Sequence, residues 1–251
     1  MLKIGKVQLG QIPRVVLGVS GNYTALSRAS ESGVDILEIR VDQFDRIEPE
    51  YVLSEVKTIK KHNLPLIGTI RAKGEGGKAR ISDSMRIALY QKIAPWVEAV
   101  DVELISGSTL GEVRSIASKS KNVLIVSHHN FSKTPDEREL KEIAQKALSS
   151  GADIIKIAAF AQNENDVIRL FEFTSRNKDK KLVTIAMGAK GSISRLMFPL
   201  AGSLMTYTSV APSGGQIPLG ELIQDLRLYY PRFNEEVVNR LGLLEYVWGL
   251  S

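Results

Sequence analysis

The stretch that decides the fold is "NVLIVSHHNFSKTPDERELKEIAQKALSSGADIIKIAA", residues 122–159. It begins and ends with short runs rich in valine and isoleucine, at 122–129 and 152–159, and such runs are typical of buried strands. The segment between them places apolar side chains on one face at the spacing of a helix. The stretch therefore predicts a strand, a helix and a second strand in succession.

The boundaries of this helix are also predicted from the residues around it. A helix is expected over 136–150, with the apolar stripe Leu140, Ile143, Ala144, Ala147 and Leu148. Thr134 and Glu137 have the spacing of a capping box, and Pro135 suits the first helical position. Gly151 suits the end of the helix.

The same alternation of apolar run and helical segment extends along the whole chain. Eight repeats without a linker-like tract predict an α/β fold, a (β/α)8 TIM barrel that forms a single domain over residues 1–251. An open doubly wound sheet is the alternative, but no G-x-G-x-x-G follows the first run. The eight runs span 14–20, 34–42, 65–71, 99–104, 122–129, 152–159, 181–188 and 204–210.

Composition excludes several classes of protein. The 251 residues are 43% hydrophobic and 24% charged and include no cysteine, so disulfides, thiolate metal sites and cysteine nucleophiles are excluded. We expect no membrane partner, since neither a secretory leader nor an apolar stretch of spanning length is present, and the cytoplasm is the default location. The net charge is +5, but the lysines are scattered among acids, so we expect no nucleic-acid partner.

Several predicted strands carry polar or ionisable side chains at every second position. In a barrel strand alternate side chains point inward, and an unpaired charge beneath the helices would be costly, so these groups should point into the barrel. They could form a purely structural ion network, which is the plainer interpretation of Asp101 or Glu103. Barrel active sites lie at the C-terminal ends of the strands, and the residues at or near such ends are Arg40, Arg71, Glu103, His129, Lys156 and Met187.

Lys156 stands within the run "DIIKIAA" among apolar and small neighbours. Burial and nearby cations such as Arg40 or Arg195 would lower the pKa of its amine. A neutral amine can condense with a ketone or an aldehyde to form an imine. The structural alternative is a buried salt bridge to Glu38 or Glu103.

Two of the three histidines are adjacent in "SHHNF". Because side chains alternate along a strand, His129 should face the barrel axis and His128 the helical layer, where packing or support is its expected role. His129 is therefore the candidate acid/base. Glu75, in the glycine-rich loop "RAKGEGGK" (71–78), could orient the imidazole.

Two more glycine-rich segments follow the seventh and eighth runs, "MGAKGSISR" (187–195) and "APSGGQIP" (211–218). The corresponding loops bind phosphate in many barrels. With Arg195 nearby, they predict a site for an anionic group of the substrate.

Several of these motifs resemble one known family, type I 3-dehydroquinate dehydratase of the shikimate pathway. The resemblance runs from the second strand to the last helix in order and spacing. The motifs are "EIR" (38–40), R-x-x-x-E-G-G (71–77), "DVEL" (101–104), S-H-H-N-F-x-K-T-P (127–135), "DIIKIA" (153–158), M-G-x-x-G-x-I-S-R (187–195) and "GQI" (215–217).

The resemblance implies dehydration of 3-dehydroquinate to 3-dehydroshikimate without a metal or an organic cofactor. Lys156 would form an imine with the C3 ketone. His129 would assist that step, remove the C2 proton and protonate the departing C1 hydroxyl, and Glu75 would orient His129.

The resemblance also implies the substrate contacts. Arg195 and Gln216 would hold the C1 carboxylate, and the eighth loop would close as a lid. One departure concerns the serine that many members carry four residues before the glutamine: this chain has Pro212 there, so Ser213 is the candidate for that role. The other binding residues would be Glu38, Arg40 and Arg71 on the ring hydroxyls and Met187 against the ring.

Two other functions stay open on the residues alone. An aldolase acting on a phosphorylated sugar would share the lysine and the anion site, but it would not need a histidine oriented by Glu75. A non-catalytic barrel would bind a ligand without turnover. Members of the family are commonly dimers, so a homodimer is expected, and the apolar stretch 241–250 is either a core helix or an interface.

Overall fold

The computed structural model describes residues 2–21, 26, 29 and 32–241, and in it eight parallel strands form a nearly closed barrel. The strand order is β10-β3-β4-β5-β6-β7-β8-β9, and a backbone hydrogen bond of 2.9 Å from Leu204 N to Leu182 O crosses the seam between the first and last strands. All eight predicted runs form strands, which confirms the predicted barrel. The strands are β3 (Val15–Val19), β4 (Ile36–Arg40), β5 (Leu66–Thr69), β6 (Ala99–Glu103), β7 (Val123–Asn130), β8 (Ile154–Phe160), β9 (Leu182–Met187) and β10 (Thr206–Ser209).

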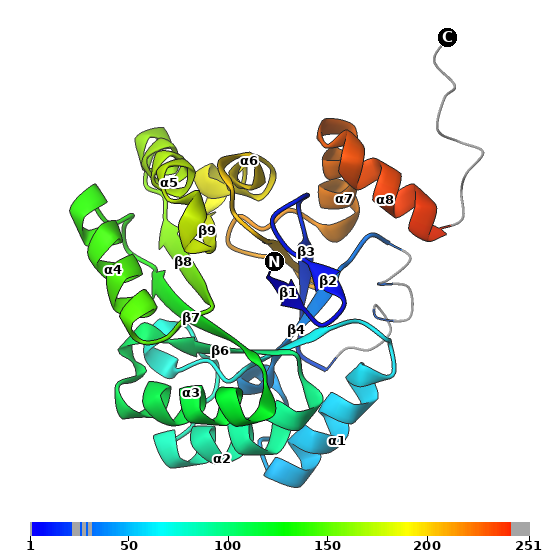
Figure 1. Ribbon diagram of the computed structural model, residues 1–251, viewed down its shortest axis with the longest axis vertical. Helices are drawn as coiled ribbons and strands as arrows, with labels where there is room; N and C mark the ends of the chain where they lie inside the picture. The colour runs from blue at the N-terminus through cyan, green and yellow to red at the C-terminus, as the bar shows by residue number, and fades with distance from the viewer. Residues whose placement is uncertain (1, 22–25, 27–28, 30–31, 242–251) are drawn as a thin grey trace.

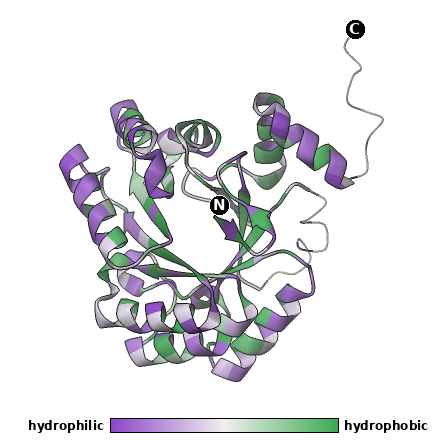
Figure 2. Ribbon diagram, in the orientation of Figure 1, coloured by the Kyte–Doolittle hydropathy of each residue, from purple (hydrophilic) through white to green (hydrophobic). Residues whose placement is uncertain are grey.

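The helices form an outer ring around the strands (Figure 1). Most of their buried residues are apolar and most of their exposed residues are polar, and the hydropathy view shows green and purple side by side on several helices (Figure 2). Between β3 and β4, half of the residues lie outside the described ranges. The helices are α1 (Pro49–Lys60), α2 (Asp83–Ile93), α3 (Ser108–Ser120), α4 (Glu137–Ser149), α5 (Glu164–Arg176), α6 (Ser194–Ala201), α7 (Leu219–Tyr229) and α8 (Pro231–Leu241).

The capping box of α4 differs from the prediction. Asp136, rather than Thr134, is the N-cap: its carboxylate accepts a 2.7 Å hydrogen bond from Glu139 N, and the Glu139 side chain accepts one from Asp136 N. The prediction was wrong by two residues because the Thr134 hydroxyl donates instead to the backbone oxygen of Phe160, at the end of β8. The predicted end was right, since Gly151 follows the helix with φ at +87°.

The interior of the barrel is apolar at its N-terminal end and charged at its C-terminal end. Inward side chains near the strand starts form one buried apolar cluster, which includes Val16, Ile36, Ile67, Ala99, Ile125, Ile154 and Val183. A short hairpin of β1 (Lys3–Ile4) and β2 (Val7–Gln8) supplies Ile4 to the same cluster, so the hairpin closes this end. The inward charges that were predicted from alternation lie above this floor.

A network of ion pairs attaches the last helix, α8, to the barrel. Arg240 donates to Asp35 Oδ1 at 2.8 Å, and Arg14 contacts both Asp35 and Glu236. Of the apolar stretch 241–250, Leu241 is the last residue of α8, and residues 242–250 lie outside the described residues. In the described ranges, no helix has both the length and the apolar character that a bilayer crossing requires.

The apolar floor should contribute to the stability of the barrel. We expect Ile125→Ala, which truncates a fully buried side chain, to lower the free energy of unfolding by about 2–5 kcal/mol. The matched control is Ile168→Ala on α5, where the residue is 54% exposed and the change should stay within about 0.5 kcal/mol. Urea unfolding of both variants measures the difference, and equal losses would contradict this account of the core.

Candidate active site

A cavity of about 450 Å³ opens at the C-terminal ends of the strands. Its wall comes from nearly every strand of the barrel and from the loops that follow them. All ten site residues predicted from the sequence line this one cavity: Glu38, Arg40, Arg71, Glu75, His129, Lys156, Met187, Arg195, Ser213 and Gln216.

Lys156 is buried in the wall of the cavity with its ammonium between two carboxylates. Its Nζ lies 3.1 Å from Glu38 Oε1 and 3.0 Å from Asp101 Oδ2. Burial by itself lowers the pKa of Lys156, but Asp101 and then Glu38 outweigh burial and raise that pKa above its ordinary value. The predicted low pKa is therefore wrong, because two carboxylates lie within 3.1 Å of the ammonium and their attraction outweighs burial.

His129 is held from its Nδ1 side by Glu75. Glu75 Oε2 accepts hydrogen bonds from His129 Nδ1 at 2.8 Å and from His129 N at 2.9 Å. Burial, with the nearby cations Arg71 and Lys156, lowers the pKa of His129 well below its usual value. The imidazole is therefore neutral at neutral pH, with Nδ1–H as the donor and Nε2 as the basic nitrogen.

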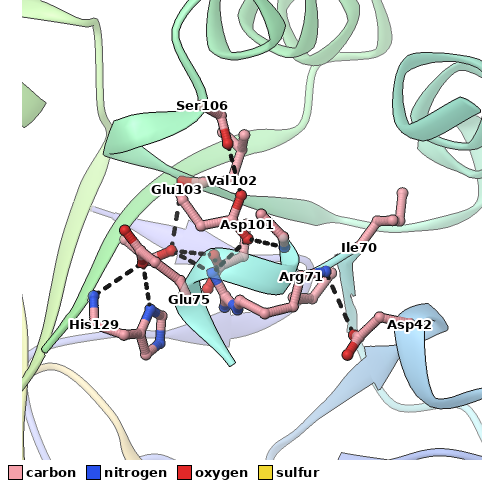
Figure 3. Close-up of polar contacts among 12 residues, drawn as sticks. Asp42, Ile70, Arg71, Glu75, Asp101, Val102, Glu103, Ser106 and His129 are labelled. Carbon is pink, nitrogen blue, oxygen red and sulfur yellow. Dashed lines mark hydrogen bonds and ion pairs between the residues drawn. The ribbon is translucent and has the colours of Figure 1, made fainter. Parts of the chain in front are cut away.

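The 3-10 turn Lys73–Glu75 brings Glu75 over the cavity after β5. Its backbone approaches Arg71 so closely at Gly77 that a Cβ there would lie 2.2 Å from Arg71 O. Burial raises the pKa of Glu75 to about 8, and Glu103 adds to the rise while Arg71 opposes it. Figure 3 shows Glu75 between His129 and the Arg71 cluster.

Arg71 is the centre of that cluster. Its guanidinium lies 3.0 Å from Asp101 Oδ1 and 3.0 Å from Glu103 Oε1, and it donates to Ser127 Oγ at 2.6 Å (Figure 3). Glu103 also pairs with Arg86 of α2. Glu103 thus belongs to a structural network, whereas Asp101 belongs both to this network and to the lysine site.

Arg40 is held by a residue that sequence reasoning missed. Asp42 accepts a bidentate pair from Arg40, 2.9 Å for each bond, and also a bond from Lys78 N. It therefore links the strand end to the glycine-rich loop that carries Glu75. Its position two residues after Arg40 was the available signal.

Arg195 is buried beside the cavity without a carboxylate partner. One NH group donates to Ala186 O and to Ser194 Oγ, at 2.8 Å each, whereas its buried Nε has no hydrogen-bond partner. Burial lowers the pKa of Arg195 to about 10, so the side chain is still a cation at neutral pH. An unpaired buried cation favours an anionic ligand here.

The loop after β10 is packed onto the loop after β9. Gly188 N donates to Gly214 O at 3.0 Å, and at Gly215 a Cβ would lie 2.0 Å from Gly188 O, so only glycine fits. Within the loop, Gln216 Oε1 accepts from Ser209 Oγ and from Ser213 N. Ser213 therefore positions Gln216 through its backbone.

Two further residues complete the site. The Tyr207 ring centre lies 4.2 Å from Lys156 Nζ, and Tyr207 was missed although the same alternation along 204–210 places it inward. His128, expected to support or pack, has its Nδ1 3.8 Å from Glu75 Oε1. Among the described residues, no group of three or more histidine, aspartate or glutamate side chains could hold a metal ion.

The family model described as Type I 3-dehydroquinase matches residues 17–232. The chain belongs to the type I 3-dehydroquinase family. A relative in this family, 3-dehydroquinate dehydratase of Thermodesulfovibrio yellowstonii, is 36% identical over 218 residues, which cover 86% of this chain and 95% of the relative.

Solved structures of type I 3-dehydroquinase family members are also similar. The Clostridium difficile type I 3-dehydroquinate dehydratase, with covalently modified comenic acid, has a TM-score of 0.85 and 30% identity, over 90% of this chain and 96% of that one. The 3-dehydroquinate dehydratase of Aquifex aeolicus has a TM-score of 0.78 and 32% identity, over 87% of this chain and 99% of that one.

The raised pKa of Glu75 has a consequence for stability in this member of the type I 3-dehydroquinase family. A folded pKa of about 8, above the ordinary 4.5, means that folding favours the protonated form, so Glu75 lowers stability progressively as the pH rises through that interval. We compare the melting temperature of Glu75→Gln with that of the unchanged protein at two pH values. We expect the difference to favour the variant more at about pH 9 than at about pH 5. Calorimetry at both pH values measures this, with Glu112→Gln on the exposed face of α3 as control. A difference that does not change with pH would contradict the raised pKa.

Proposed function

We propose that this chain is a type I 3-dehydroquinate dehydratase, a lyase of the shikimate pathway that converts 3-dehydroquinate into 3-dehydroshikimate by way of a lysine imine. One observation carries the proposal: Lys156 and His129 line the same cavity, and His129 Nδ1 is hydrogen-bonded to Glu75 Oε2 at 2.8 Å. A buried amine and an oriented neutral imidazole are the groups that this elimination needs. Family membership supports the substrate.

The first step is imine formation. Lys156 begins as an ammonium, so it must lose a proton before its nitrogen can attack the C3 ketone, and neutral His129 is the acceptor. The attacking nitrogen then passes one proton to the former ketone oxygen and the imidazolium returns the other, so this oxygen leaves the carbinolamine as water. The positive charge moves from the ammonium to the iminium, where Glu38 and Asp101 still balance it.

The second step is elimination. His129 Nε2 removes the C2 proton, and the electrons move into the iminium to give an enamine. The enamine then expels the C1 hydroxyl, which takes the proton back from His129 and leaves as water. Hydrolysis of the product imine regenerates the amine of Lys156. A relative solved with covalently modified comenic acid supports covalent chemistry in this family.

The remaining predicted residues would hold the substrate. The unpaired Nε of Arg195 supports a bond to the C1 carboxylate, beside Gln216 and the neighbouring Ser213. Closure of the glycine-rich loop around Gly215 would exclude water. The ring would lie against Met187, and its hydroxyls would meet Glu38, Arg40 and Arg71.

The aldolase alternative shares the lysine and the anion site, but it gives no role to the His129–Glu75 bond. The homodimer remains a prediction that rests on the family resemblance, and the cytoplasmic location remains a prediction that rests on the sequence composition.

Borohydride trapping tests the covalent step. After incubation with 3-dehydroquinate and borohydride, the unchanged protein should gain the mass of a reduced imine, because reduction makes the bond to Lys156 permanent. Lys156→Ala should gain none, whereas Lys141→Ala, which removes a lysine from the exposed face of α4, should trap normally. If the intact-mass spectrum shows no adduct in any protein and no enone product appears in the ultraviolet spectrum, the dehydratase proposal is wrong.

Steady-state kinetics test the anion site. We expect Arg195→Ala to raise the KM for 3-dehydroquinate about 10- to 100-fold, because a hydrogen bond to a charged group contributes about 1.5–3 kcal/mol. The control is Arg176→Ala, on the exposed end of α5, with an unchanged KM. An unchanged KM in Arg195→Ala would mean that the carboxylate binds elsewhere.

A further inference from the structure

Two buried polar atoms at the edge of the cavity face each other without a hydrogen bond. They are Glu75 Oε1 and His128 Nδ1, which lie 3.8 Å apart, and neither has a hydrogen-bond partner. Buried polar atoms without partners are rare because leaving them unpaired costs free energy. A relative movement of less than about 1 Å would bring this pair within hydrogen-bond distance.

The two oxygens of Glu75 have different tasks. Oε2 accepts two N–H groups of His129, from the ring and from the backbone. An oxygen that accepts two donors is a poor place for a proton, so a proton on the carboxyl group belongs on Oε1. His128 Nδ1 is the ring nitrogen that faces Oε1.

The charges around Glu75 make its protonation finely balanced. Arg71 from the end of β5 favours the carboxylate, whereas Glu103 and Asp101 from β6 oppose it, and His129 from β7 donates to it. Lys156 and Arg40 act on His129. Burial also lowers the pKa of His128, so this ring is a neutral partner at neutral pH.

We propose that His128 is a positioning residue, whose Nδ1 shares one proton with Glu75 Oε1 and thereby holds Glu75 as an acceptor for His129. When Glu75 is protonated, Oε1–H donates to His128 Nδ1. When Glu75 is ionised, His128 Nδ1–H donates to Oε1. In the first arrangement the ring proton of His128 is on Nε2. On ionisation the Oε1 proton passes to Nδ1 and the Nε2 proton is released to solvent, so one proton lies between Oε1 and Nδ1 in both arrangements and the net change is the loss of one proton. In both, Oε2 accepts from His129 Nδ1–H, which leaves His129 Nε2 free to act as a base.

This role extends the proposed dehydratase function, on which its catalytic consequence rests. It assigns a task to the histidine that strand alternation placed on the helical side. A histidine that only filled space could be replaced by phenylalanine without effect on the proton chemistry of Glu75 and His129. A histidine that shares a proton could be replaced by asparagine, whose side-chain nitrogen occupies about the place of Nδ1.

Nuclear magnetic resonance of the ¹⁵N-histidine protein tests the proton directly, without substrate. The chain has only three histidines, so each can be assigned with single variants, and His62 in a distant loop is the internal reference. In the unchanged protein we expect the His128 and His129 resonances to move together with a midpoint near the Glu75 pKa of about 8. We expect Glu75→Gln to abolish that shared step. Independent titrations of the two rings would overturn the proposal whether or not any variant folds.

The pH profile of dehydration tests the catalytic consequence. We expect His128→Phe to lower kcat by about 10-fold, a part of the 10²–10⁴ that an oriented acid/base supplies, and to shift the pH profile of kcat, with little change in KM. His128→Asn should restore most of the rate, and His62→Asn should change nothing. Equal pH profiles in the unchanged protein and in His128→Phe would overturn the proposal.

The two experiments separate this proposal from the proposed function. If the unchanged protein does not dehydrate 3-dehydroquinate, the function is wrong, but the spectrum still reports whether His128 and Glu75 share a proton. If the unchanged protein is active and the rings titrate independently, the function stands and this inference is wrong.

Discussion

The buried guanidinium of Arg71 is the interaction on which the upper half of the barrel depends. Asp101, Glu103 and Ser127 all lie within hydrogen-bond distance of it, so it balances carboxylates that would otherwise be too costly to bury in the barrel. Asp101 then has a second oxygen for Lys156, and Glu103 has one for Arg86. Removing this cation would leave anions facing one another beneath the cavity.

This network explains why Lys156 is charged. The strands place Glu38 and Asp101 within 3.1 Å of Lys156 Nζ, so the attraction of two anions exceeds the penalty of burial. Burial of His129, together with the nearby cations Arg71 and Lys156, lowers the pKa of its imidazole and keeps the ring neutral. The cavity is thus lined by an ionised proton donor, Lys156, and a neutral proton acceptor, His129. Their surroundings determine which of the two is charged.

The sequence predicts the fold because the fold follows from periodicity, and eight apolar runs with period-two charges place Lys156 and His129 inside the barrel. Periodicity does not place Glu75, Arg195, Ser213 and Gln216, which were assigned from the glycine-rich segments and the family resemblance. The register between strands decides which ions pair: Glu38, one of the two salt-bridge partners that the sequence suggested for Lys156, does pair with it, but the other partner is Asp101 rather than Glu103, and the sign of the pKa shift was not predicted. The conformations of the loops could not be predicted either. Asp42 accepts hydrogen bonds from Arg40, and the Thr134 hydroxyl donates to Phe160 O at the end of β8 instead of capping α4. The N-terminal hairpin has no motif in the sequence. Its Ile4 is recognisable as a core residue only once the apolar cluster that it packs against is known.

The pairing of Lys156 with two carboxylates has a consequence for the course of the proposed reaction. Nζ carries a positive charge at the start of imine formation, as an ammonium, and at its end, as an iminium; only the attacking amine between these two states is neutral. The dipoles and ions around Nζ are therefore already arranged for both the first and the last state of this step. The rigidity of the ion network, with Glu38 and Asp101 on strands whose backbones are already bonded, would therefore keep the reorganisation energy of imine formation low.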